Sequence, residues 1–146
     1  MNPWIQLAAA FAGSFGFAML FNIHGRKLLL SSLGGLLSWG VYLLAEHFGL
    51  GDHPSAFCAS VALTLYSEGM ARVCRVPVTL FLVTSAIPLI PGASLYYTAQ
   101  AMMLQQWSFA AQKGLYTLLF SASMSAGITL TTLFFRMFLR HVRQAH

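Results

Sequence analysis

Few charged side chains in this chain could bind a small ionic solute. Glu68 and Arg72 stand four residues apart, so a helix would bring them together on one face as an ion pair, with Arg75 about one turn further. Ionisable residues at membrane depth are costly and typically mark an ion or substrate pathway. The alternative is that all three lie at the membrane interface, where long side chains reach water and anchor a helix end.

A break in a long uncharged stretch is the second feature with chemical content. Pro88, Pro91 and Gly92 interrupt it. Each proline removes a backbone donor and clashes with the carbonyl four residues back, so acceptors around residues 84–87 should be released. Gly92 is expected to take a backbone conformation closed to other residues. In a bilayer such groups must be buried in protein or line a wet cavity, as in the substrate sites of transporters. A simple kink used for packing is the alternative.

Neutral polar side chains follow this break, and they complete the predicted substrate pathway. We expect the released backbone groups and the hydroxyls of Ser94 and Tyr96 to meet a substrate near the membrane midplane. Arg26 or Arg72 would attract its carboxylate at the cytoplasmic mouth, and Asn22 would cap the first span or hydrogen-bond across helices. The predicted pathway residues are Asn22, Arg26, Glu68, Arg72, Ser94, Tyr96 and Gln100.

The composition predicts a protein embedded in a lipid bilayer. Hydrophobic residues make up 58% of the chain and charged residues 8%, whereas about a quarter of an ordinary soluble domain is charged. The formal charge of +5 does not indicate nucleic-acid binding, because the basic residues are divided among short connections and the C-terminal stretch. Neither a zinc-ligand spacing nor an ATP-binding motif is present, so we expect no metal and no cofactor.

Five apolar segments approach the length of about 20 residues that a bilayer requires. They predict an all-α integral membrane bundle, a single transmembrane domain over residues 1–146, with the fourth helix broken at the two prolines. The expected spans are residues 3–22, 28–45, 54–71, 77–105 and 114–138.

Basic residues alternate between successive connections, which predicts an orientation. Arginines and lysines follow the first, third and fifth spans, whereas Glu46 and Asp52 follow the second and only Lys113 follows the fourth. Under the positive-inside rule the N-terminus is then periplasmic and the C-terminus cytoplasmic. Two full spans, or a re-entrant hairpin, between residues 77 and 112 would force the basic C-terminus outside.

Small residues at helical spacing predict close helix packing, because lipid offers no hydrophobic drive for helices to associate. This structural interpretation is favoured over a role in binding substrate. The residues are Ala8, Ala12 and Gly16 in the first span, Ser31 and Gly35 in the second, and Ser123 and Gly127 in the fifth.

Several of these segments resemble the small subunit of the bacterial threonine/serine exporter family, which is similar to the C-terminal half of the longer single-chain exporters. The matching residues are Phe17 to Asn22 with Arg26, then Arg72 and Pro77, then Ile87 to Gly92 with Tyr96. The run Pro-x-x-Pro-Gly-x-x-x-Tyr is the most specific part. His24 departs from the family, where proline tends to follow Phe-Asn-x, so the exact turn after the first span is open.

The resemblance implies export of threonine and serine, or in some two-subunit members of dicarboxylates such as succinate, across the bacterial inner membrane. It also implies a larger membrane subunit. Apart from the resemblance, the sequence itself indicates a partner subunit. Five helices with one broken segment lack the two related halves from which alternating access is usually built. We expect a heteromer, which could hold several copies of this chain, driven by the proton gradient or by substrate exchange.

Two other classes of function remain as alternatives. One is an accessory subunit that stabilises its partner without forming the transport path. The other is an intramembrane enzyme in which Ser94, after Gly92 and Ala93, acts as a nucleophile. Since every histidine lies at a loop or terminus, that serine would have no base, and we expect no enzymatic activity.

Overall fold

The computed structural model describes residues 2–144, with side chains described up to residue 137. These residues form six α-helices and a short 3-10 helix, η1, and contain no strand, which confirms the predicted all-helical fold. The elements are α1 (Pro3–Leu20), α2 (Arg26–His47), α3 (Asp52–Cys74), α4 (Val78–Ala86), η1 (Ile87–Leu89), α5 (Gly92–Met103) and α6 (Trp107–Gln144).

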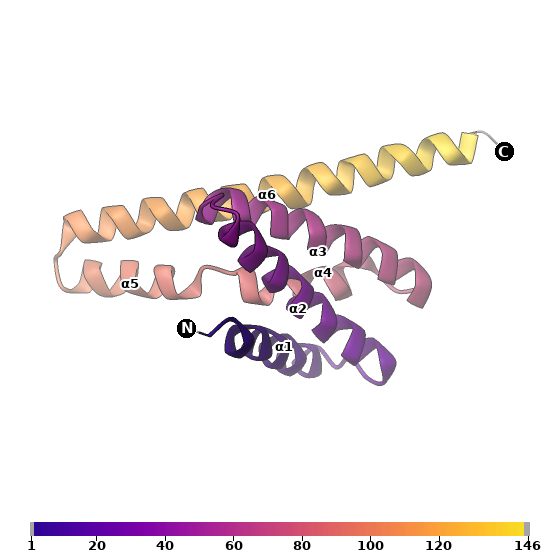
Figure 1. Ribbon diagram of the computed structural model, residues 1–146, viewed down its shortest axis with the longest axis horizontal. Helices are drawn as coiled ribbons and strands as arrows, with labels where there is room; N and C mark the ends of the chain where they lie inside the picture. Colours follow the sequence, from indigo (N-terminus) through magenta and orange to yellow (C-terminus); the bar gives the residue numbers. More distant parts are fainter. Residues whose placement is uncertain (1, 145–146) are drawn as a thin grey trace.

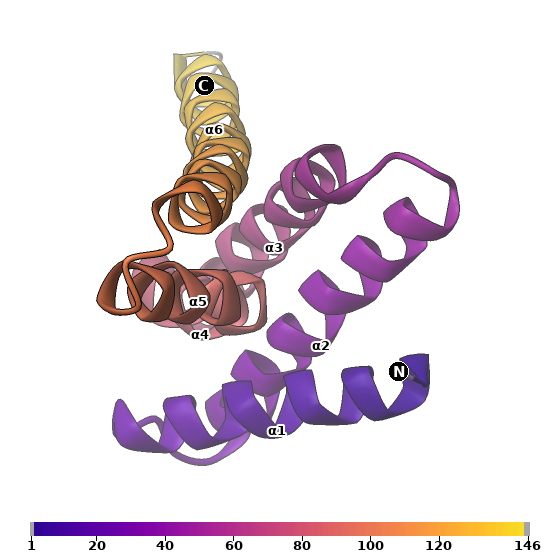
Figure 2. The same ribbon diagram turned by 90° about the vertical axis from the view of Figure 1, so that its left-hand side faces the viewer.

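The central helix of the bundle is α3. It packs against α2 on one side and α6 on the other, while α1 lies on the far side of α2 (Figure 2). The half-helix α4 fits against both α2 and α3. Among the described residues α5 packs against α6 alone, and the hairpin of these two helices extends away from the rest of the bundle (Figure 1).

Four of the helices end in the same backbone turn. After α1, the amide of Asn22 donates to the carbonyl of Met19 and the amide of Ile23 to that of Ala18, at 2.9 and 3.0 Å. This is the Schellman arrangement, which needs a left-handed residue just past the helix. Asn22 supplies it with a φ of 59°, so it ends α1 as the capping prediction expected. The equivalent residues after α2, α3 and α5 are Gly49, Arg75 and Gln105.

The turn left open by His24 is also defined. The Nδ1 atom of His24 lies 2.8 Å from the carbonyl oxygen of Asn22, and Gly25 follows with a φ of 66° before α2 begins. A histidine therefore fits where the resemblance expected proline, because the direction change is made by the flanking left-handed residues.

Small hydroxyl residues form much of the core. Ser60, Thr64 and Ser67 of α3 are fully buried, and each hydroxyl donates to a carbonyl three or four residues earlier, at 2.7 Å. Because these bonds lie within the helix, the hydroxyls are satisfied and the helix surface stays narrow. Neighbouring helices can therefore approach α3 closely.

The predicted small-residue contacts are confirmed on α2 and α6 but were wrong on α1. A Cβ on Gly35 would collide with Ser14 of α1, and one on Gly127 would collide with Ser60 of α3. On α1 the residues Ala8, Ala12 and Gly16 are exposed instead. The buried positions of α1 are Ala10, Ser14 and Ala18, which repeat with the same spacing on another face.

Within the described residues, three helices are long and apolar enough to cross a membrane: α1, α2, and α6 over Trp107–Met137. A fourth candidate is a bent pair of segments, Val78–Leu89 and Gly92–Met103, which are long and apolar enough when taken together. The two segments meet at a bend of 58° and count as one span if they cross the membrane together. Helix α3, with 23 residues, has the length but a more polar composition. Its membrane span therefore stays a prediction.

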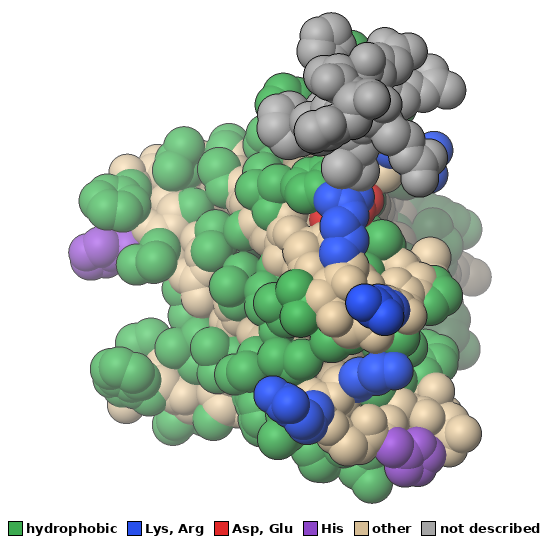
Figure 3. All heavy atoms as spheres, turned by 90° about the vertical axis from the view of Figure 1, so that its right-hand side faces the viewer, with side chains coloured by type: hydrophobic (Ala, Val, Ile, Leu, Met, Phe, Trp, Pro, Cys, Tyr) green, Lys and Arg blue, Asp and Glu red, His purple; other side chains and the backbone are tan. Residues whose placement is uncertain are grey.

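Lysine and arginine side chains gather at the end of the molecule where α1 joins α2 and α3 joins α4 (Figure 3). Arg26 begins α2 there, and Arg75 follows α3. The basic residues of these two connections, which were expected on the cytoplasmic side, therefore share one end. The expected cytoplasmic Arg140 and Arg143 lie outside the residues whose side chains are described. The side of the membrane that this end faces stays a prediction.

Candidate functional site

The helix is interrupted at the position that the two prolines predict. Helix α4 ends at Ala86 and α5 begins at Gly92. Between them the amide of Gly92 donates to the carbonyl of Ile90 at 2.7 Å, across Pro91 with φ −76° and ψ 55°. These angles are those of an inverse γ-turn.

The expectation for Gly92 was wrong. Its φ is not among the positive ones, and it takes the first position of α5. Pro91 makes the turn, so Gly92 has no need of a special backbone conformation.

A backbone carbonyl next to the break accepts a hydrogen bond from a neighbouring helix. The hydroxyl of Ser38, on α2, lies 2.8 Å from the carbonyl oxygen of Ser85 and donates to it. The carbonyl of Ile87 accepts from the amide of Ile90 at 3.3 Å. The break is therefore braced by α2, and the Ser85 carbonyl belongs to a fully buried residue.

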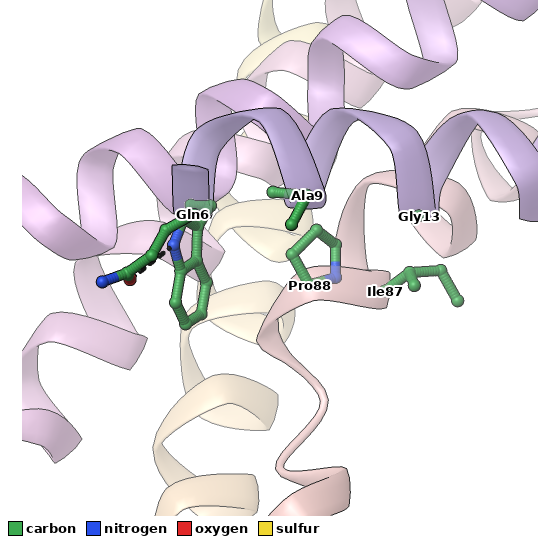
Figure 4. Close-up of a pocket in the computed structure, with 7 residues that line it drawn as sticks. Gln6, Ala9, Gly13, Ile87 and Pro88 are labelled. Atoms are coloured by element: carbon green, nitrogen blue, oxygen red, sulfur yellow. Dashed lines mark hydrogen bonds between the residues drawn. The ribbon is translucent and has the colours of Figure 1, made fainter. Parts of the chain in front are cut away.

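A pocket of about 300 Å³ lies beside the break, between α1, α2 and η1 (Figure 4). Alanines and a glycine on α1 leave the space, and Trp39 and Pro88 enclose it. Nε1 of Trp39 donates to Oε1 of Gln6 at 3.2 Å, so an indole and an amide supply its polar groups. The lining residues are Gln6, Ala9, Ala10, Gly13, Trp39, Ile87 and Pro88.

Two other pockets are lined mainly by apolar side chains. One of about 460 Å³ lies between α1 and α2 and includes Leu7 and Leu43; the other, of about 360 Å³, lies beside the start of α4 and includes Leu80 and Val83. Neither includes a residue of the break. The pocket beside Pro88 is therefore the candidate site.

The polar residues after the break do not line this pocket. The hydroxyl of Ser94 lies 2.6 Å from that of Thr117 and 3.3 Å from the carbonyl oxygen of Lys113, both on α6. Tyr96 is 63% exposed, and Gln100 is exposed as well. The geometry makes Ser94 a contact between α5 and α6, while Tyr96 and Gln100 lie on the open surface of the hairpin.

The predicted pairing of Glu68 with Arg72 is confirmed. A guanidinium nitrogen of Arg72 lies 3.0 Å from Oε2 of Glu68, whose side chain is 8% exposed. The guanidinium also lies over the ring of Phe135 on α6, 4.4 Å from its centroid, and remains 41% exposed. A buried carboxylate without a partner is costly, so the ion pair with Arg72 stabilises Glu68. The guanidinium of Arg72 remains partly exposed and could still contact another anion.

Asn22 and Arg26 lie at the α1–α2 connection, where Asn22 ends one helix and the exposed Arg26 begins the next. Of the predicted pathway and break residues, Pro88 alone lines the pocket. Sequence reasoning missed Gln6 and Trp39. Their polarity within strongly apolar segments is the signal that could have indicated them.

Among the residues whose side chains are described, no three or more His, Cys, Asp or Glu residues come together as a group that could hold a metal ion. The pocket therefore offers mainly apolar contact, and its polar side chains are the Gln6 amide and the Trp39 indole, which are hydrogen-bonded to each other. Such a site can orient a small molecule.

The pocket and the break lie within a region that matches a known family. The family model described as threonine/serine exporter, ThrE, matches residues 6–134, from the first turn of α1 to late in α6. No solved structure matches the chain. The family and the apolar helices indicate a membrane transport protein. Because the match covers most of the sequence, the chain belongs to the threonine/serine exporter family.

Proposed function

We propose that this chain is a subunit of an inner-membrane exporter that moves small amino acids such as threonine and serine, or dicarboxylates such as succinate, together with a larger membrane subunit. The pocket beside the broken helix is the observation that carries this proposal. Its volume of about 300 Å³ is at the lower end of the range of small-molecule sites, which suits a solute of a few heavy atoms.

The lining of the pocket supports a shared binding site. None of its lining residues carries a charge, and its polar groups belong to Gln6 and Trp39. Amino acids and dicarboxylates are charged, and transfer of a charge into an apolar site is costly without a partner of opposite charge. We therefore place the remaining ligands of the substrate on the larger subunit.

The hairpin of α5 and α6 supports the same partnership. Tyr96 and Tyr97 are exposed on α5, at 63% and 48%, and Gln100 is exposed one turn later. Polar groups that face hydrocarbon have no water to satisfy them, so contact with another protein is the favourable arrangement at membrane depth. We assign this surface to the larger subunit.

The basic end of the molecule gives the proposed path a direction. Arg26 and the open side of Arg72 would attract a carboxylate at the cytoplasmic mouth, and the substrate would then move towards the pocket near the midplane. This requires the orientation indicated by the loop charges, with a periplasmic N-terminus and a cytoplasmic C-terminus.

The proposal is tested by filling the pocket. Gly13 lines it, and a Cβ built at Gly13 meets no atom within 4 Å, so the side chain of Gly13→Leu can start there without a clash at its Cβ. We expect efflux of labelled threonine or succinate from vesicles containing both subunits to fall at least tenfold, with normal membrane abundance.

Gly16→Leu is the matched control, because Gly16 lies on the same helix, is equally open and does not line the pocket. It should retain efflux close to that of the wild type. Normal efflux in Gly13→Leu would refute the pocket, and would favour the accessory-subunit alternative.

A further inference from the structure

A second cluster of polar side chains lies where α2 meets α3, away from the residues of the pocket. Asp52 is the first residue of α3, and its Oδ2 accepts a hydrogen bond of 2.7 Å from the hydroxyl of Tyr116 on α6. The ring of Phe120 lies 6.0 Å from that of Tyr116 and 6.1 Å from that of Tyr42 on α2. The carboxylate therefore joins α3 to α6, and aromatic contacts extend the cluster to α2.

His53 completes the cluster. Its ring meets that of Tyr116 edge to face, with centroids 5.3 Å apart. The Nε2 atom of His53 is buried and has no hydrogen-bond partner in the described part of the chain. A carboxylate and an imidazole, both able to bind protons, thus contact the same tyrosine.

We propose that Asp52 is a proton-binding site whose protonation loosens the contact of α3 with α6. Ionised, the carboxylate accepts charge-assisted hydrogen bonds, which are roughly twice as strong as neutral ones, and it lies at a helix N-terminus, where negative charge is favoured. Protonation removes the charge and turns one of its oxygens into a donor. The phenol of Tyr116 then loses its strong acceptor.

Several other titratable groups lie around Asp52. Tyr42 and Glu46 lie on α2, Tyr116 on α6 and His53 on α3 itself. Asp52 has no ion-pair partner in the described residues. No arginine or lysine therefore fixes its charge.

A chain of aromatic contacts connects this cluster to the pocket. The ring of Tyr42 stacks on that of Trp39 with centroids 4.9 Å apart, and Trp39 donates to Gln6 in the pocket. A shift of Tyr42 would therefore move a wall of the pocket. Resting on the proposed function, we infer that proton uptake at Asp52, from the side opposite the basic end, drives the substrate-releasing change in the pocket.

The first test follows protonation without transport. The purified full chain in lipid nanodiscs, with Trp4→Phe and Trp107→Phe, retains Trp39 as its tryptophan; both replaced residues are largely exposed. We expect Trp39 emission to show one transition between neutral and acidic pH. Asp52→Asn, which still accepts from Tyr116 but cannot bind the proton, should abolish it, and Glu46→Gln should keep it.

Tyr116→Phe gives an independent check should Asp52→Asn fail to fold. It removes a donor to the ionised carboxylate, so the transition should move to higher pH by about one unit. An unshifted transition in this variant, or a wild-type transition in Asp52→Asn, would overturn the proposal. A transition lost in His53→Gln but kept in Asp52→Asn would do so too, by placing the proton on His53.

The second test uses vesicles that contain both subunits and radiolabelled threonine or succinate. Asp52→Asn should lower efflux driven by a proton gradient at least tenfold and retain exchange of internal for external substrate at equal pH. Undiminished gradient-driven efflux would contradict coupling at Asp52. If the wild type moves neither solute, the proposed function fails, whereas the fluorescence test still decides the role of Asp52.

Discussion

Single residues near the break have roles that differ from those their position suggests. Ser94 follows the break directly, yet its hydroxyl lies against Thr117 of α6. Gln6 is far away in sequence, yet it lies in the pocket. The Ser94 hydroxyl is held in a contact between two helices, whereas the amide of Gln6 and the indole of Trp39, which are bonded to each other, line the pocket.

The Ser94 contact leads to a prediction about stability. Ser94→Ala removes one intramolecular hydrogen bond, so we expect a loss of about 0.5–1.5 kcal/mol in stability. Apparent affinity for threonine or succinate should stay unchanged, because Ser94 does not line the pocket. Thermal unfolding of the purified protein and efflux at several substrate concentrations measure the two quantities. A two- to tenfold weaker affinity with an unchanged unfolding temperature would contradict this prediction and indicate that Ser94 contacts the substrate.

At the scale of elements, the helices are held together by small side chains and by caps. Gly127 of α6 lies so close to Ser60 of α3 that a Cβ would collide with it, and that Cβ would also lie 2.9 Å from the carbonyl oxygen of Phe57. The backbone carbonyl cannot move without distorting α3. The contact of α3 with α6 therefore depends on the absence of a side chain at this position.

Gly127→Ala should consequently separate the two helices. We expect a loss of about 1–3 kcal/mol, typical of overpacking at a tight contact, and a lower unfolding temperature. Gly69→Ala is the control, because Gly69 lies on α3 and a Cβ there meets no atom within 4 Å. This control should be neutral or slightly stabilising, since alanine favours a helix more than glycine does. Equal unfolding temperatures for the two variants would contradict the tight contact.

At the scale of the whole molecule, α6 extends beyond the other helices. Its 38 residues correspond to about 57 Å, roughly twice the thickness of a bilayer core. Helix α5 accompanies its first part and contacts no other helix of the described chain. A single transmembrane domain over residues 1–146 stays our prediction, with the α5–α6 hairpin as the part that meets the larger subunit.

Two measurements on the whole chain follow from this arrangement. Expressed alone, it should insert into the membrane without efflux above background, and it should copurify with the larger subunit when both are made. Replacing Tyr96 and Tyr97 with alanine should weaken that copurification severalfold, because their exposed rings form the proposed contact. Robust efflux by the isolated chain would show that no partner is needed.

The orientation is tested separately by reporter fusions. A fusion after His146 should report a cytoplasmic C-terminus, and one near Gly51 a periplasmic connection, because the basic residues of the α1–α2 and α3–α4 connections share the opposite end. A periplasmic reporter after His146 would reverse the proposed direction of transport.

Local chemistry by itself determined several features of this protein. The all-helical character follows from the apolar composition, the break from Pro88 and Pro91, and the Glu68–Arg72 pair from its spacing on one helix. Each of these depends on residues within a few positions of one another. The geometry of a single helix or proline is sufficient to fix them.

Only the tertiary structure decided which surfaces meet. Helix α1 is apolar on all sides, so the spacing of its small residues could not tell the exposed Ala8 from the buried Ala10. The Trp39–Gln6 and Tyr116–Asp52 contacts join residues far apart in the chain. Periodicity shows which side chains share a face, but the neighbour that covers that face is chosen by the packing of the whole bundle.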